Sequence, residues 1–138
     1  MQYLYCIIWK KVINIPQNRI IYYKYNILWK EFFKELGCDI IVSPETNFEI
    51  LENGKKYSAS EMCLSLKIYI GHVFYLKDKV DYVLVPRIVC EKINSESCTN
   101  FIALYDIINN TFDVNILNYN VDERKRKTEE SAFIKMGE

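Results

Sequence analysis

Three cysteines in the middle of the chain are the side chains best suited to do chemistry. Cys63 falls in one of the first two turns of an expected helix, and Cys90 and Cys98 stand near the ends of a polar stretch that follows an expected strand. A thiol near a helix N-terminus feels the positive end of the helix dipole, which favours the thiolate needed for metal ligation or nucleophilic attack. Free cysteines are also among the most buried residue types, so an inert, packed Cys63 is the alternative.

Cys90 and Cys98 would bracket most of a strand-to-helix loop of about a dozen residues, which is long for an α/β fold. In an open α/β sheet, the loops that leave the carboxyl ends of the strands form the ligand crevice together with the neighbouring helix starts. Three thiolates gathered at that edge would suit an iron–sulfur cluster. The alternative is that the two loop thiols are unpaired surface groups.

Two further residues near this edge have both a functional and a structural interpretation. His72 lies in the middle of the long expected helix, where a lone histidine is more often a hydrogen-bonded structural residue than a ligand. Arg87 follows an expected strand and could bind an anion, although an ion pair with Glu91 is the commoner arrangement. With one histidine, no glycine-rich phosphate motif and no CxxC pair, the sequence signals no serine–histidine–aspartate centre, no classical nucleotide site and no zinc site of the usual spacing.

Apolar runs and helical repeats predict the elements that would position these side chains. Strands are expected at 12–15, 39–44, 81–86 and 113–119. Long helices are expected at 19–36, with Gly37 just past its end, and at 58–77, where Ser58 and Glu61 fit a capping box. Shorter helices are expected at 46–52, ended by Asn53–Gly54, and at 99–108.

The order of these elements predicts an α/β fold. A strand, a helix and a strand within residues 11–44 make a βαβ unit, so the first two strands should be parallel. We therefore expect a three-layer, Rossmann-like domain at 11–122 with a mainly parallel four-stranded sheet. Residues 1–10 would be an N-terminal appendage or an edge strand, and 123–138 a charged C-terminal tail, read as a solvated helix that frays.

Composition narrows the classes of function. The 138 residues are the size of one domain, and 18 basic residues balance 18 acidic ones, so there is no electrostatic footprint for nucleic acid or an anionic membrane. The apolar run at the start stops at Lys10, short of the roughly 20 residues that span a bilayer, and no secretory signal is recognised. Five cysteines, an odd number, then favour a reduced, cytoplasmic setting over a disulfide scaffold.

Several motifs follow one another in an order that resembles one family. They are Ile15–Pro16, ELG at 35–37 with IIVSP at 40–44, Glu61-x-Cys63-x-x-x-Lys67, GHV at 71–73, VDYVLVPRIV at 80–89, and Cys98 followed by Phe101. On these motifs the chain resembles the acyl-CoA dehydratase activase-related proteins, also described as CoA enzyme activase-associated domains. These are similar in turn to the D-component-like subunits of 2-hydroxyacyl-CoA dehydratases. The resemblance runs from about Lys11 to Asp122.

The resemblance implies a Rossmann-like parallel sheet and a role in anaerobic acyl-CoA dehydratase chemistry. In the related dehydratase subunits, cysteines hold a [4Fe–4S] cluster that receives an electron from an ATP-driven activator. Matched by motif, Cys63 and Cys98 would be cluster ligands. Cys90 stands where the family tends to have a small polar residue and would be a substitute for the third ligand.

Other signature positions of the family are occupied by Glu61, Lys67, His72 and Arg87, and the resemblance makes Lys67 and Arg87 positive charges that stabilise the anionic cluster. The chain departs from the family pattern at Thr99–Asn100, where the family has Pro-Lys. Family members are usually at least twice as long, so a truncated copy is expected, with the missing C-terminal half as a partner.

Two functions are therefore expected. The first is an accessory protein, or fragment, of the 2-hydroxyacyl-CoA dehydratase and activase system that binds a [4Fe–4S] cluster and works with dehydratase components. The second is a non-enzymatic α/β module that docks a partner subunit through an exposed edge and whose cysteines are incidental. Neither function involves nucleic acid or a membrane.

Overall fold

The structure is a computed structural model that describes residues 12–15, 22–92 and 95–138. The expectation of an appendage or edge strand at 1–10 lies outside the described residues. Within them, helices alternate with strands of one sheet, so the prediction of a mixed α/β fold is confirmed.

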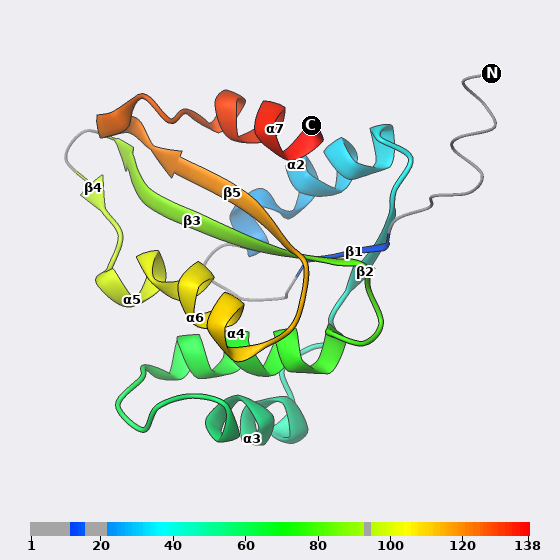
Figure 1. Cartoon of the computed structure of the whole chain (residues 1–138), viewed down its shortest axis with the longest axis vertical. Coiled ribbons are helices and arrows are strands. Elements are labelled where there is room, and N and C mark those ends of the chain that lie inside the picture. The colour runs from blue at the N-terminus through cyan, green and yellow to red at the C-terminus, as the bar shows by residue number, and fades with distance from the viewer. Residues whose placement is uncertain (1–11, 16–21, 93–94) are drawn as a thin grey trace.

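The sheet of the described residues has five strands (Figure 1). They are β1 (Val12–Ile15), β2 (Asp39–Val42), β3 (Tyr82–Lys92), β4 (Ser95–Glu96) and β5 (Ile116–Asp122). Parallel neighbours run in the order β2, β1, β3, β5, while the short β4 pairs antiparallel with the far end of β3. The parallel pairing of β1 with β2 is the one that the βαβ pattern predicts. Pairing is longest between β3 and β5, whereas β1 meets β3 only at Tyr82 and Val83.

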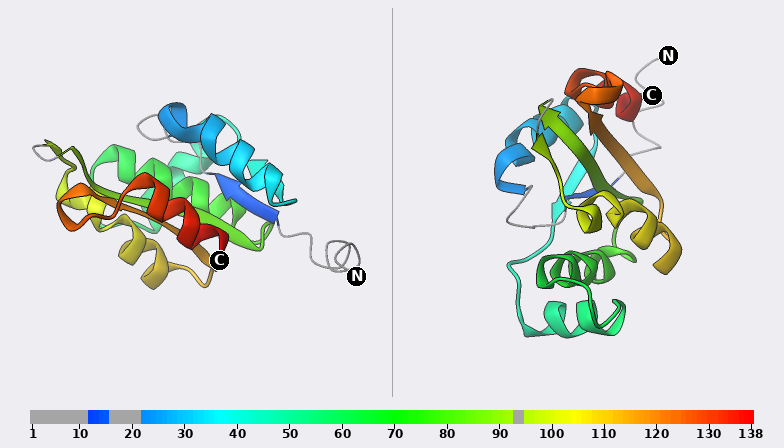
Figure 2. Two further views of the ribbon diagram at one scale, coloured as in Figure 1. Left: turned by 90° about the horizontal axis from the view of Figure 1, so that it is seen from above. Right: turned by 90° about the vertical axis from the view of Figure 1, so that its left-hand side faces the viewer.

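Helices lie on both faces of this sheet (Figures 1 and 2). On one face are α2 (Tyr22–Glu35), which contacts β1 and β2, and α7 (Glu129–Gly137), which contacts β5. On the other face are α4 (Leu64–Leu76), α5 (Thr99–Ile102) and α6 (Leu104–Thr111), and α3 (Phe48–Lys56) packs on the outer side of α4. A 3-10 turn, η1 (Glu123–Lys125), joins β5 to the last helix.

The core lies on both sides of β3, whose consecutive residues Val83, Leu84 and Val85 are all buried. A run of this kind is typical of a parallel strand covered on both faces. On the side of α2 and α7, the ring of Tyr119 packs against an aromatic group formed by Tyr25, Trp29 and Phe133. On the side of α4, the buried Tyr69 hydroxyl donates a 2.8 Å hydrogen bond to the Leu84 carbonyl, which ties this helix to the sheet.

Two glycines let α3 and α4 lie in backbone contact. A Cβ built on Gly54 would stand 1.9 Å from the carbonyl oxygen of Lys67, and one built on Gly71 would stand 2.0 Å from that of Ile50. The prediction that Asn53–Gly54 ends a helix was therefore wrong, since Gly54 lies inside α3 at the helix crossing. Only a residue without a Cβ fits there.

The third strand is longer than predicted, because β3 continues past Pro86 to Lys92. The N–H of Val83 bonds to Asn115 on the β5 side, and backbone groups alternate sides along a strand, so position 86 faces the β1 side. There β3 is paired with β1 only at Tyr82 and Val83. The missing N–H of proline therefore breaks no described ladder bond, and Cys90 lies in a strand instead of a loop.

Other predicted elements also differ from the structure. The capping box was wrong: the Ser58 hydroxyl bonds to the Lys55 carbonyl at the end of α3, and Cys63 is the N-cap of α4. The helix expected at 99–108 is two short helices joined at Ala103. The fourth strand lies at Ile116–Asp122, three residues later than expected, and the segment 123–138 forms η1 and α7, which packs on β5.

Candidate functional site

Cys63 and Cys98 occupy equivalent places in the fold. Each is the residue that caps the start of a helix, α4 for Cys63 and α5 for Cys98, and each is an exposed, free thiol. Figure 1 shows that both helices begin on the side of the molecule where β3 ends. The fold therefore puts these two thiols on the side of the sheet that the parallel topology favours for ligands.

Cys90 is placed differently from its predicted position. It lies within β3, where its main chain is in register with Asp122 of β5 and with Glu96 of β4, at an irregularity in both pairings. The bulge leaves Cys90 near the carboxyl end of β3, the same end from which the chain leads toward Cys98. Across the residues that the structure describes, no group of three histidine, cysteine, aspartate or glutamate side chains is arranged to hold a metal ion.

Lys67 and Glu61 belong to the segment that leads into α4. The Lys67 ammonium donates a 2.8 Å hydrogen bond to the Ser60 carbonyl, and the Ser60 hydroxyl lies 3.4 Å from a Glu61 carboxylate oxygen. The first backbone bond of the helix joins the Lys67 N–H to the Cys63 carbonyl at 3.1 Å. Lys67 thus ties the segment before Cys63 to the first turn of α4.

His72 is a structural residue of the core. It is fully buried in α4, and its Nε2 lies 3.1 Å from the hydroxyl of Thr46 in the segment between β2 and α3. Its Nδ1 has no hydrogen-bond partner among the described residues. Burial lowers the pKa of His72 to about 4, so the ring is neutral at physiological pH. This geometry favours a hydrogen-bonded structural histidine over a ligand.

Arg87 pairs with a residue that the sequence did not suggest. Its guanidinium lies 2.7 Å from the Asp106 carboxylate of α6 and 5.0 Å from the centre of the Tyr105 ring. The expected partner was Glu91, but the strand continues through both residues and α6 packs over Arg87. The pair ties β3 to α6, and the charge of Arg87 is already compensated there.

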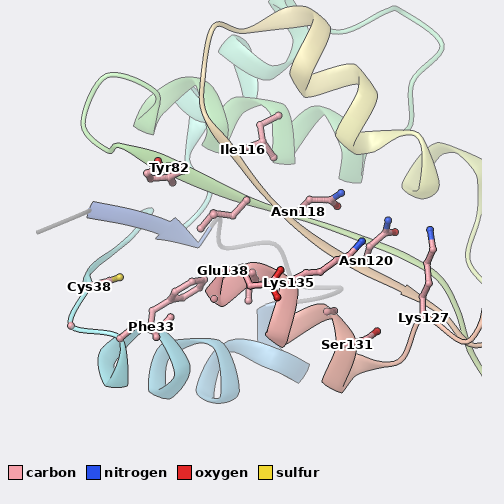
Figure 3. Close-up of a pocket in the computed structure, with 16 residues that line it drawn as sticks. Phe33, Cys38, Tyr82, Ile116, Asn118, Asn120, Lys127, Ser131, Lys135 and Glu138 are labelled. Carbon is pink, nitrogen blue, oxygen red and sulfur yellow. The ribbon is translucent and has the colours of Figure 1, made fainter. Parts of the chain in front are cut away.

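A pocket that the sequence did not reveal lies along β5, on the side of the sheet that carries α2 and α7. It has a volume of about 870 Å³ and lies between the end of α2, the strand β5 and the helix α7 (Figure 3). The lining residues from β5 are Ile116, Leu117, Asn118 and Asn120, and those from the last part of the chain include Lys127, Ser131, Ala132, Lys135, Met136 and Glu138. One wall is the segment that was expected to be a solvated tail. The signal that could have revealed it was the apolar patch Ala132–Phe133–Ile134, since Ala132 is buried against the sheet.

Comparison with known proteins gives one finding. A family model described as "CoA enzyme activase uncharacterised domain (DUF2229)" matches residues 12–138. Neither the curated proteins nor the solved structures gave a match. No helix among the described residues has the length and apolar character to cross a membrane. Because the match spans nearly the whole sequence, the chain belongs to the CoA enzyme activase domain family.

Proposed function

We propose that this chain is an accessory domain of the anaerobic 2-hydroxyacyl-CoA dehydratase and activase system, and that it acts by docking a partner subunit. The observation that carries this proposal is the family match over residues 12–138. The domain would be cytoplasmic and would have a Rossmann-like parallel sheet. Its partner would bind at the carboxyl side of the strands. This surface carries the two exposed thiols of Cys63 and Cys98.

The described residues on their own do not fit a [4Fe–4S] cluster. Such a cluster is usually held by four cysteine thiolates, and the described side chains offer two at this surface, Cys63 and Cys98. A cluster bound here needs further thiolates, from Cys90 or from the partner. We therefore propose that the chain binds a cluster only together with its partner, which would supply further thiolates, and that Lys67 is the nearby positive charge.

The alternative function is a docking module whose cysteines are incidental. It is favoured by large apolar side chains that stand exposed on the helices: Phe48 (77%), Ile27 (76%), Ile134 (59%) and Leu64 (58%). Leu64 directly follows Cys63, so a partner that covers this surface would bury an apolar residue beside the thiol.

Anaerobic reconstitution separates the two functions. The chain would be mixed with iron and sulfide, alone and with a purified dehydratase component, and analysed for bound iron and for broad absorption at about 400 nm. Shared cluster binding predicts absorption only in the mixture, reduced in Cys63→Ala and Cys98→Ala. Cys38→Ala is the matched control, because Cys38 is half-buried and directly precedes β2, at the amino end of that strand. A complex that forms but shows no absorption after reconstitution would leave the docking module with incidental cysteines, and no complex would overturn both functions.

A further inference from the structure

The strand β5 is the outermost parallel strand of the described sheet, and its outer edge faces the 870 Å³ pocket. β5 pairs with β3 along one side. No strand of the described residues pairs with its other side. An uncovered edge presents a row of unpaired N–H and C=O groups, which is a template for another strand.

The hydrogen bonds identify the residues that face outward. The Asn115 carbonyl accepts a bond from Val83 of β3, so odd-numbered positions turn toward β3. Asp122 exchanges two backbone bonds of 2.8 and 3.0 Å with Lys127, which lies outside the sheet, so even-numbered positions turn outward. The open part of the edge therefore consists of Ile116, Asn118 and Asn120, and all three line the pocket. At Asp122 the backbone of Lys127 already occupies the outward N–H and C=O groups.

The wall opposite this edge combines apolar and positively charged groups. Figure 3 shows the ends of Asn118, Asn120, Lys127 and Lys135 gathered in one half of the pocket, while Phe33, Cys38 and Tyr82 lie in the other half. Lys127 and Lys135 are the cations among the lining residues, and Glu138 is the acidic side chain among them. A ligand with apolar groups along its length and a carboxylate near the two lysines matches this arrangement.

We propose that the groove between β5 and α7 binds an extended segment of a partner protein, which adds a strand to the outer edge of β5 and places an acidic side chain near Lys127 and Lys135. The proposal rests on the docking function above and adds to it a second contact surface, whose lining does not include Cys63 or Cys98. Three outward peptide groups at alternate positions match the repeat of an extended chain, which gains affinity from main-chain bonds and specificity from side-chain pockets. A second copy fits less well, because edge-to-edge pairing would bring the lysines of both copies to one groove.

The test uses a fluorescein-labelled peptide with the sequence Glu-Val-Thr-Val-Thr-Val-Asp and the full chain. Binding would be measured by fluorescence anisotropy, and the exchange of backbone amides by NMR. We expect saturable binding with a Kd below about 1 mM. The amides of Ile116, Asn118 and Asn120 should become protected in the complex. A peptide with lysine in place of both acidic residues should bind at least about fivefold more weakly.

Two variants locate the surface. Asn118→Pro removes an outward N–H and no bond to β3, so it should preserve the fold and weaken binding about tenfold. Lys127→Glu with Lys135→Glu should weaken it about fivefold, and provides a second variant if the proline substitution disturbs folding. Lys125→Glu is the matched control: Lys125 is exposed, lies in η1 and does not line the pocket, so its affinity should remain within about twofold of the original.

The other outcomes overturn the proposal. Absence of binding, or binding that Asn118→Pro leaves unchanged, would show that the edge accepts no strand. Protection of the three amides without peptide would show that the edge is already paired within the chain. Self-association that Asn118→Pro abolishes would identify a second copy as the occupant. None of these results bears on complex formation with a dehydratase component through the surface of Cys63 and Cys98, which is measured separately.

Discussion

The contact between α3 and α4 gives the sharpest prediction about stability. In Gly71→Ala the new Cβ would lie 2.0 Å from the Ile50 carbonyl oxygen, whereas Cβ contacts under 3.0 Å essentially never occur. The two helices would have to separate by about 1 Å, which costs about 3 kcal/mol in lost packing, the upper end of the range for an overpacked core. The higher helix propensity of alanine than of glycine raises the free energy of unfolding by about 1 kcal/mol. We expect a net loss of about 2 kcal/mol from the free energy of unfolding.

Gly54→Ala should cost a similar amount, because its Cβ would lie 1.9 Å from the Lys67 carbonyl oxygen across the same helix pair. One separation of the helices relieves both clashes. Because the second alanine also adds about 1 kcal/mol of helix propensity, the double variant should lose no more stability than the worse single variant, instead of the sum of the two losses.

Urea denaturation followed by far-UV circular dichroism measures these changes. The matched control is Gly137→Ala in α7, where the nearest atom to the new Cβ is a ring carbon of Phe32 at an ordinary 3.4 Å, and where stability should change by less than about 0.5 kcal/mol. Gly71→Ala at or above the stability of the original chain would refute the backbone contact. Additive losses in the double variant would refute the shared displacement.

Two further predictions concern His72 and the thiols. The pKa of His72 is about 4 in the folded chain and 6.5 in the unfolded chain. Its contribution to the free energy of unfolding is therefore complete above pH 6.5 and is lost as the pH falls toward 4, by about 3 kcal/mol in total. In urea titrations at several pH values, His72→Gln should lose less stability than the original chain over this range, and an equal loss in both would contradict the burial of a neutral ring. Cys63 and Cys98 are exposed whereas Cys38 is half-buried, so a thiol reagent should label the first two at least about tenfold faster in the folded chain, and mass spectrometry that finds Cys38 labelled first would contradict the placement of both helix starts.

Elements with a strong local pattern could be predicted from the sequence. The strand at Val12–Ile15 is found as expected, because its apolar run ends at a proline. The helix at Tyr22–Glu35 is also found, and Gly37 follows it at a φ of 75°, a conformation that glycine adopts easily. Its buried residues are Tyr25, Trp29 and Phe33, whereas Leu28 and Leu36, on the stripe that the spacing favoured, are exposed. Each of these elements is indicated by residues that lie close together in the sequence.

Long-range features could not be predicted. Ser58 and Glu61 match a capping box in sequence, but nothing local indicates that Ser58 instead bonds to the end of α3. Gly54 looks like a helix end, and only the approach of α4 shows that it is a contact position. Similarly, Arg87 has an acidic neighbour at Glu91, while its observed partner Asp106 comes from a helix that folds over the strand.

The candidate site was predicted in part. Sequence motifs placed Cys63 near a helix start and Cys98 just before a further helix, and both are N-caps in the structure. Cys90 was expected in a loop, because Pro86 was taken to end its strand. The pocket beside β5 was missed because its wall forms only when α7 packs against a strand that precedes it in the sequence.

Sedimentation velocity under anaerobic conditions tests the docking role most directly. The chain would be mixed with a purified 2-hydroxyacyl-CoA dehydratase component, without added iron, and compared with each protein alone. An accessory domain of this system predicts one faster boundary that contains both proteins. Two boundaries that sediment as the separate proteins do, at concentrations of about 100 μM, would contradict the role.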